Sequence, residues 1–312
     1  MIFKRLFKKK SMDFFVGINI CPLGLTLAKG IHQEQSWEFI DTRSVDFEGD
    51  HGWFIALKDT VSKLSERCGC CIVLPNNMYQ IQAIEKPNVP ESELLHALPW
   101  SLKELVNMNA EEMILDYYDP AFQVPNQPEK INVVVTHRQV ISKIVELFRK
   151  AKPKLIGISI EDLVMRNMLP IQEEPILQVV QSMNKEPALH IIKNGQSFFS
   201  RRLRGFNQIH EYTEDELGEG VADTLSVEIQ RSIDYFEGQI KQGTISSIQL
   251  SMPTPALTFL VNRVNNNFGA AVSELQWSHG DLPEDLTPLW NYFPAFCGAV
   301  EGQLLIEEGM YD

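Results

Sequence analysis

The chain has 312 residues and a formal net charge of −13, with 44% hydrophobic and 22% charged residues. These values exclude collagen, coiled coil and wholesale disorder, and the length predicts about two domains. Residues 1–10 hold five of the 28 bases and no acid, so the rest of the chain carries 23 bases against 41 acids. A body this acidic repels a phosphate backbone, which argues against nucleic acid as a partner.

The sequence contains no candidate membrane span and no secretory signal. The longest mostly apolar run, residues 14–28, is interrupted by Asn19 and Pro22, and no small-residue cleavage site follows it. The five cysteines are an odd number, which favours reduced thiols and a cytoplasmic protein. A zinc site is the alternative for the crowded cysteines, but no second Cys or Cys/His pair has the required spacing. These cysteines are Cys68, Cys70 and Cys71.

Residues 1–12 form a basic leader. Its apolar residues Ile2, Phe3, Leu6 and Phe7 lie at helical spacing, so a helix here would have an apolar side and a cationic side. One interpretation is a frayed terminus. The other is a peripheral tether to an anionic inner leaflet of a membrane, where each base contributes roughly 1 kcal/mol. The predicted membrane contacts are Phe3, Lys4, Arg5, Phe7, Lys8, Lys9 and Lys10.

The next segment, residues 13–170, has the pattern of an α/β lobe. Hydrophobic patterning predicts three strands, then a helix and a short buried strand, over 13–20, 23–30, 36–43, 53–67 and 70–74. The pattern is interrupted by an insertion at about 78–130, with a strand, a helix opened by Pro90, another strand and a proline-rich loop. It then resumes with strand, helix, strand and helix over 131–136, 140–148, 155–160 and 161–169.

A polar segment, 170–175, marks the predicted boundary with a second lobe over 171–312. This lobe opens with three strands, followed by a long helix and then alternating strands and helices. The predicted ranges are 176–180, 189–193, 197–203, 215–241, 247–251, 255–267, 271–275 and 288–305. Because the order of the first lobe recurs, we expect a duplicated two-lobed α/β architecture.

This repeated order resembles the actin-like ATPase fold, which is also called ribonuclease H-like. Residues 15–20 (FVGINI) are similar to the opening Gly-Ile-Asp-Ile-Gly strand of that fold. Further motifs resemble the PilM-like family of type IV pilus biogenesis proteins, from the basic start at residues 7–10 to about residue 300. They are residues 90–94 (PESEL), 98–100 (LPW), 115–117 (LDY) and 229–236 (IQRSIDYF).

The resemblance includes the branch of this family that serves MSHA-type pili and, more remotely, the cytoplasmic part of the type II secretion protein GspL. It implies a cytosolic assembly platform at the inner membrane. It also implies a groove beside the insertion that binds the cytosolic N-terminal segment of a PilN-like membrane partner. Apolar residues of the insertion helix could anchor this peptide or form local core, and both interpretations stay open. They are Leu94, Leu98, Trp100, Leu102 and Leu105.

The resemblance also implies an ATP site of two phosphate-binding hairpins and a glycine-rich adenosine loop. An aspartate in each hairpin would hold the water shell of magnesium, and glycines would let backbone N–H groups approach the phosphates. The first hairpin has Asn19 and Cys21 where the acid and the glycine are expected. The second, within 180–187, contains neither Asp nor Gly. The degenerate positions are Asn19, Cys21, Gln181, Met183, Ser251 and Met252.

These losses predict a pseudo-ATPase with no cofactor, metal or catalytic residue, which acts as a binding scaffold. In the alternative, Glu186 or Asp162 replaces a lost acid and the protein is an active ATPase that regulates pilus or type II secretion assembly. A sugar kinase of the same fold, or a homo-oligomer of the actin-like kind, are the other options. Binding of nucleotide separates the enzymes from the scaffold.

Three further groups have simpler explanations than a site. His137 lies between a predicted strand and helix, without a nucleophile motif around it. Residues 279–281 have the composition of a turn. Arg201, Arg202 and Arg204 could grip an anionic partner, but internal pairing with acids such as those of 214–219 is the preferred interpretation.

Overall fold

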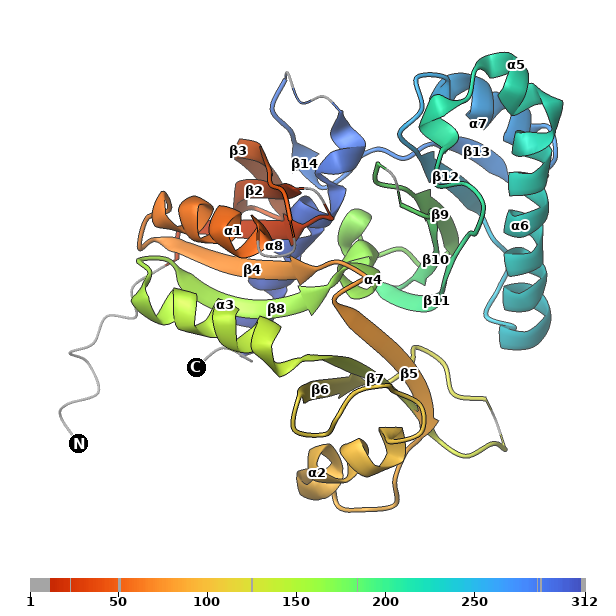
Figure 1. Cartoon of the computed structure of the whole chain (residues 1–312). Helices are drawn as coiled ribbons and strands as arrows, with labels where there is room; N and C mark the ends of the chain where they lie inside the picture. Colours follow the sequence, from red (N-terminus) through yellow and green to blue (C-terminus); the bar gives the residue numbers. More distant parts are fainter. Residues whose placement is uncertain are drawn as a thin grey trace.

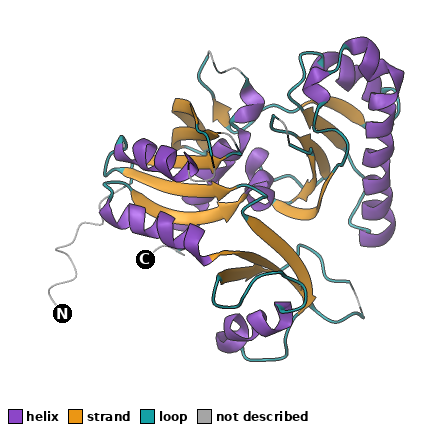
Figure 2. Cartoon of the chain, in the orientation of Figure 1, coloured by secondary structure: helices purple, strands orange, loops and turns teal. Residues whose placement is uncertain are grey.

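The computed structural model describes residues 12–22, 24–49, 52–124, 126–183, 185–284, 286 and 288–309. The predicted membrane contacts of the basic leader, Phe3 to Lys10, lie outside this range. The chain forms two α/β lobes with a small third unit attached (Figures 1 and 2). Among the described residues, no helix has the length and apolar character that crossing a membrane requires.

The first lobe is built on a six-stranded sheet in the order β14-β3-β2-β1-β4-β8. Strand β1 pairs antiparallel with β2 and parallel with β4. Its last five residues are all buried, as expected for a central strand that is covered on both faces. Helices α1 (Gly52–Ser62) and α3 (Arg138–Lys150) cover one face. The strands are β1 (Phe14–Ile20), β2 (Gly24–Gln33), β3 (Ser36–Asp46), β4 (Cys68–Leu74) and β8 (Lys154–Ile160).

The C-terminal segment returns to this first lobe. Strand β14 (Gly280–Asp281) pairs with β3, and helix α8 (Phe293–Glu307) covers the face of the sheet opposite α1 and α3. The predicted second lobe over 171–312 is therefore too long. The physical reason is a close helix–sheet contact: a methyl group added at Gly17 of β1 would lie 1.8 Å from the backbone oxygen of Ala295 in α8. A short 3-10 turn, η5 (Leu289–Asn291), leads into α8.

The insertion is a three-stranded sheet in the order β5-β7-β6, with helix α2 (Glu91–Leu102) on one face. Its central strand, β7, is the segment that sequence patterning assigned to the main lobe at 131–136. The insertion therefore extends to His137, since β7 pairs with both β5 and β6. The strands are β5 (Tyr79–Glu85), β6 (Met113–Tyr118) and β7 (Lys130–His137).

The second lobe has a five-stranded sheet in the order β11-β10-β9-β12-β13. Its core joins the sheet to helices α6 and α7. The single long helix predicted over 215–241 is interrupted, because Gly220 adopts a φ of 128° that no helix contains. The strands are β9 (Ile176–Val180), β10 (Ala188–Lys193), β11 (Gln196–Arg202), β12 (Ser247–Ser251) and β13 (Ala271–Glu274).

Short helical segments complete the described chain. Helix α4 and the 3-10 turn η1 follow β8 and connect the lobes. The interrupted helix consists of α5, η3, α6 and η4 in succession. The bounds are α4 (Glu161–Val164), η1 (Met165–Met168), η2 (Ile209–Glu211), α5 (Glu214–Glu216), η3 (Leu217–Val221), α6 (Ala222–Tyr235), η4 (Phe236–Ile240) and α7 (Leu257–Asn265).

Substitution of Gly17 by alanine tests the contact between α8 and the first lobe. The added methyl would collide with the α8 backbone, so we expect the free energy of unfolding to fall by about 3 kcal/mol. Urea denaturation measures this change. The control is Gly238→Ala in η4, where no atom lies within 4 Å of the new methyl and a small gain is expected. Equal stability of the two variants would contradict the contact.

Candidate functional site

The segments predicted to bind phosphate and adenosine do meet between the lobes. The backbone N–H of Gln181 donates to the carbonyl of Ser251 at 2.8 Å, and Cys21 lines one pocket of about 290 Å³ together with Met183. The Asn19 amide donates to the Cys21 sulfur at 3.1 Å. Burial raises the pKa of the Cys21 thiol to about 11, despite the nearby Lys185 ammonium. Asn19 is therefore bonded within its own hairpin, and Cys21 is a protonated thiol at neutral pH.

The connection between β9 and β10 is bonded to itself. The Gln181 side-chain amide donates to the carbonyls of Lys185 and Phe206, at 2.7 and 2.8 Å. The backbone N–H of Lys185 donates to the carbonyl of Ser182 at 3.2 Å. A phosphate cradle needs backbone N–H groups that point outward and have no internal partner. At Gln181 and Lys185 these donors are already used inside the protein.

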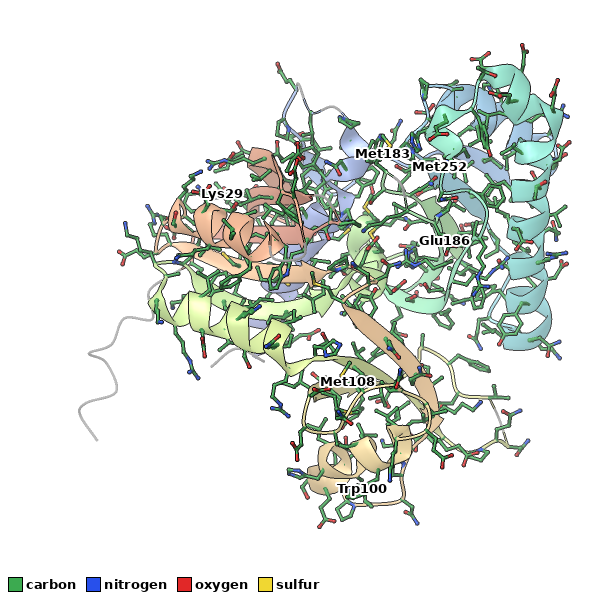
Figure 3. The ribbon with its side chains drawn as sticks, viewed as in Figure 1. Lys29, Trp100, Met108, Met183, Glu186 and Met252 are labelled. Carbon is green, nitrogen blue, oxygen red and sulfur yellow. The ribbon has the colours of Figure 1, made fainter. Side chains whose placement is uncertain are left out.

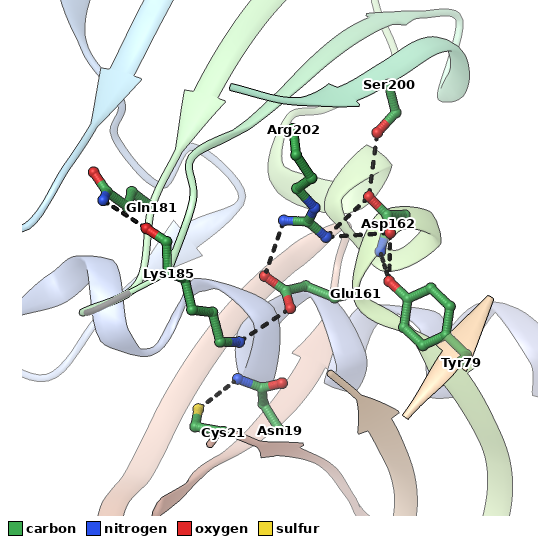
Figure 4. Close-up of polar contacts among 9 residues, drawn as sticks. All are labelled: Asn19, Cys21, Tyr79, Glu161, Asp162, Gln181, Lys185, Ser200 and Arg202. Carbon is green, nitrogen blue, oxygen red and sulfur yellow. Dashed lines mark hydrogen bonds and ion pairs between the residues drawn. The ribbon is translucent and has the colours of Figure 1, made fainter. Parts of the chain in front are cut away.

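A buried ion pair crosses the cleft at the same place (Figure 4). Lys185 from the second lobe lies 3.2 Å from the carboxylate of Glu161, the first residue of α4, and each residue is only 7% exposed. Loss of one partner from such a pair leaves an uncompensated buried charge, at a cost of about 3–5 kcal/mol. The cleft therefore satisfies its own charges, and the bond holds the two lobes together.

Met252 is one of the degenerate positions of the adenosine loop that the sequence predicts after β12. It is 1% exposed and belongs to the core of the second lobe, so its side chain fills that core rather than an open cleft. The loop after it is a closed turn, in which the N–H of Thr254 donates to the Met252 carbonyl at 2.8 Å. Figure 3 shows Met252 and Met183 near the same end of the second lobe.

Asp162, the alternative acid for a nucleotide site, belongs to a second ion pair instead. Arg202 of β11 donates to both of its carboxylate oxygens at 3.2 Å, and the hydroxyls of Tyr79 and Ser200 also donate to it (Figure 4). Burial alone would raise the pKa of Asp162, but Arg202 and these hydrogen bonds hold it below its ordinary value. The Asp162 network therefore joins the insertion, the first lobe and the second lobe.

On the other side of this network lies a groove of about 660 Å³ between the insertion and the second lobe. One wall is the face of the insertion sheet that α2 does not cover, where Tyr118, Asn132 and Ala83 lie side by side on paired strands. The other wall is β11, with Tyr235 of α6 beside it. Phe199 and Tyr235 contact each other with their ring centroids 5.2 Å apart.

Strand β11 presents its edge to the groove. It is the terminal strand of its sheet, and every residue from Ser197 to Arg202 lines the groove. Successive side chains of a strand point to opposite faces, so a lining that uses all of them runs along the strand edge. The backbone N–H and C=O groups on that edge have no strand partner among the described residues, and such an edge can pair with an added extended segment.

The insertion helix divides into core and surface. Leu94, Leu98 and Leu102 are 0% exposed and pack on the insertion sheet, so the local-core interpretation holds for them and their predicted contact with a partner is wrong. Trp100 is 78% exposed, and Figure 3 shows it projecting from the outer side of the insertion. The groove lies on the opposite face of the insertion sheet from α2.

The remaining candidates have structural roles or none. Arg201 pairs with Glu228 of α6 at 2.9 Å and Arg202 with Asp162 of α4, so these two arginines pair internally, though not with residues 214–219, while Arg204 is exposed. His137 is exposed before α3 and makes no side-chain capping bond.

Cys70 and Cys71 point to opposite faces of β4, toward α1 and α8, and cannot converge on one ion. No group of three metal-binding side chains occurs in the described ranges.

Sequence patterning missed the aromatic residues of the groove. Tyr79, Phe198, Phe199 and Tyr235 come from three separate elements, and only the folded chain brings them together. The sequence holds one weak indication of the groove, an aromatic residue on the polar side of an amphipathic helix. This residue is Tyr235, which is 48% exposed.

Comparison with solved structures identifies the fold. The chain is similar to the PilM–PilN type IV pilus biogenesis complex, with 14% identity over 92% of this chain and 98% of that chain and a TM-score of 0.66. It is also similar to the cytoplasmic domain of EpsL, an inner membrane component of the type II secretion system of Vibrio cholerae. That match has 13% identity over 93% of this chain and 94% of that chain, with a TM-score of 0.50. No protein-family model and no curated protein matches the sequence.

The predicted fold class is confirmed. The chain is a two-lobed actin-like α/β protein with an α+β insertion in its first lobe. Similarity to solved structures at 13–14% identity establishes the fold of the chain but does not establish its function.

A pH titration tests the buried core of the Asp162 network. His190 is fully buried behind Asp162 with no hydrogen bond to either ring nitrogen, and burial lowers its pKa from 6.5 to about 4. As the pH falls from 6.5 to 4 the unfolded chain binds a proton that the folded chain does not. The free energy of unfolding should therefore drop by roughly 3 kcal/mol through this window.

The variant His190→Phe keeps a ring of similar shape and cannot titrate. We expect its stability to vary less than that of the wild type between pH 6.5 and 4, as measured by urea denaturation at each pH. Parallel pH profiles of the two proteins would contradict a neutral buried histidine.

Proposed function

We propose that this protein is a non-catalytic adaptor of a pilus assembly complex at the inner membrane. The observation that carries the proposal is the groove beside the insertion, where the free edge of β11 faces an aromatic and apolar wall. Its ligand is the extended cytosolic N-terminal segment of a PilN-like membrane protein. The similarity in fold to a PilM–PilN complex and to the cytoplasmic domain of an inner membrane component supports this class of partner.

The groove suits a peptide better than a small molecule. It is open and long, and its walls offer a strand edge on one side and a sheet face on the other. A peptide that pairs with the β11 edge would turn alternate side chains toward the insertion, against Tyr79 and Ile81. Main-chain bonds would then supply affinity, and contacts with Phe199 and Tyr235 would supply selectivity.

The nucleotide cleft supports a binding role rather than hydrolysis. A triphosphate with magnesium needs outward N–H donors and acids that can hold water around the metal. In this cleft the donors of Gln181 and Lys185 are internally bonded, and Glu161 is neutralised by Lys185. The residues present do not fit ATP, so we assign the protein as a pseudo-ATPase.

The finer assignment rests on sequence motifs. The resemblance to the MSHA-type branch of the PilM-like family, represented by MshI, points to an MSHA-type pilus. The basic leader would hold the protein peripherally on the cytosolic leaflet of the inner membrane. A type II secretion complex is the related setting, and a homo-oligomer within the assembly is compatible with the same role.

Isothermal titration with Mg-ATP tests the pseudo-ATPase assignment. We expect no heat of binding at micromolar concentrations of protein and nucleotide, because the phosphate-binding donors are occupied within the chain. Saturable binding in the micromolar range, or phosphate release above the background of a heat-denatured sample, would favour the active ATPase instead.

Fluorescence polarisation with a labelled peptide tests the groove. The peptide is the cytosolic N-terminal segment of the PilN-like protein from the same organism. Tyr235 is exposed on the groove wall, so Tyr235→Ala should weaken binding tenfold or more while the thermal midpoint stays nearly constant.

Trp100→Ala is the matched control, because Trp100 is also an exposed aromatic residue but lies on the side of the insertion away from the groove. We expect the Trp100→Ala variant to bind the labelled peptide with the same affinity as the wild type. A loss confined to Trp100→Ala would place the partner on the α2 surface and refute the groove.

A further inference from the structure

A second groove, distant from the peptide groove, lies between α1 and α3 on the first lobe. It has a volume of about 520 Å³, and its floor is apolar: Phe54 and Val61 come from α1, and Leu147 and Ala151 from the end of α3. Both helices pack on the same face of the first-lobe sheet, α1 against β2 and α3 against β8, and Figure 1 shows β4 running between them. Ile55, the neighbour of Phe54, is 70% exposed beside it.

The rim of this groove is basic. Lys58, Lys150 and Lys152 line it, and all three are exposed. None of them forms an ion pair with any described residue, whereas nearby Lys63 is paired with Asp59. Glu146 is the single acid in the lining. In a chain of net charge −13, three unpaired lysines around an apolar floor are a local reversal of the general charge.

The position of the groove matters as much as its chemistry. The parallel strands β1, β4 and β8 begin at one edge of the sheet, where Phe14 is level with Cys68 and Gly69 with Lys154. The ends of α1 and α3 lie at this edge, since short connections lead from them into β4 and β8. The basic leader joins the structure there too, at Met12 beside Gly69. Its sequence carries five bases and the apolar residues Ile2, Phe3, Leu6 and Phe7.

We propose that the α1–α3 groove is a docking site for the anionic phospholipids of a bilayer. The lysines of the rim would bind headgroup phosphates, while the apolar floor and Ile55 would contact the upper acyl region. Together with the leader this makes a two-point contact, which fixes the orientation of the first lobe on the membrane. A single weak attachment leaves a protein free to rotate on the membrane, whereas two attachments at one edge of the sheet restrict that rotation.

This orientation is independent of the peptide groove, which lies between the insertion and the second lobe. The two proposals therefore fail separately: a lipid-binding variant can retain peptide affinity, and a peptide-binding variant can retain lipid affinity. An acidic protein segment is the competing occupant of the α1–α3 groove. The lysine rim and the position of Met12 at the same edge of the sheet favour the flat anionic surface of a bilayer.

Vesicle flotation with the full chain tests the proposal. The vesicles are phosphatidylcholine alone, or phosphatidylcholine mixed with phosphatidylglycerol. We expect the wild type to float only with the anionic mixture. The triple variant Lys58→Glu, Lys150→Glu, Lys152→Glu should lose about a hundredfold in partitioning, since each lysine near such a surface contributes roughly fivefold.

The control variant carries the same change in net charge on other surfaces: Lys130→Glu, Arg204→Glu and Lys241→Glu, all at exposed positions. It should float like the wild type. Ile55→Ser, which removes apolar surface without changing charge, should float less than the wild type. Far-ultraviolet circular dichroism checks that each variant is folded.

Three outcomes would overturn the proposal. The groove variant could float as well as the wild type, which would assign all membrane contact to the leader. The groove and control variants could lose the same amount, which would indicate a general charge effect. The wild type could fail to float with anionic vesicles, which would leave the groove to an acidic protein segment.

Discussion

Two adjacent carboxylates at the start of α4 determine how the parts of this protein are held together. Glu161 and Asp162 follow β8 of the first lobe, and each pairs with a base of the second lobe, Lys185 or Arg202. The Glu161–Lys185 pair is buried, so removal of either member leaves a buried charge without its partner, whereas Asp162 and Arg202 are partly exposed at the end of the groove beside the insertion. These two ion pairs therefore constrain the distance between the lobes, independently of their net contribution to the free energy of unfolding.

The same two residues lie between the cleft where the sequence predicts a degenerate nucleotide site and the groove beside the insertion. Glu161 faces the predicted nucleotide cleft, and its carboxylate forms an ion pair with the Lys185 ammonium there. Asp162 faces the opposite way, where Arg202 and Tyr79 form the end of the peptide groove. A ligand in the groove therefore lies against the element that also closes the cleft.

The surface charge follows from this arrangement. Several bases that could have served as an anion-binding surface, among them Arg201 and Arg202, are used in internal pairs. Three lysines without an ion pair among the described residues, Lys58, Lys150 and Lys152, line the groove between α1 and α3. The acidic remainder of the chain would repel an anionic membrane, so the proposed attachment would favour an orientation with this groove toward the bilayer.

The amino-acid sequence alone determined the two-lobed α/β architecture and most strand positions, because hydrophobic periodicity is a local property, and its motifs gave the resemblance to the actin-like fold. The missing acids and glycines are local as well, so the sequence by itself also predicts the loss of nucleotide-binding chemistry. It could not assign residues 280–309 to the first lobe or β7 to the insertion, since those depend on contacts between distant segments, such as α8 against Gly17. Likewise, only the tertiary structure decided that Leu94, Leu98 and Leu102 are core while β11 is open. An amphipathic helix shows which side is apolar, but whether that side is covered depends on the elements that the fold brings against it.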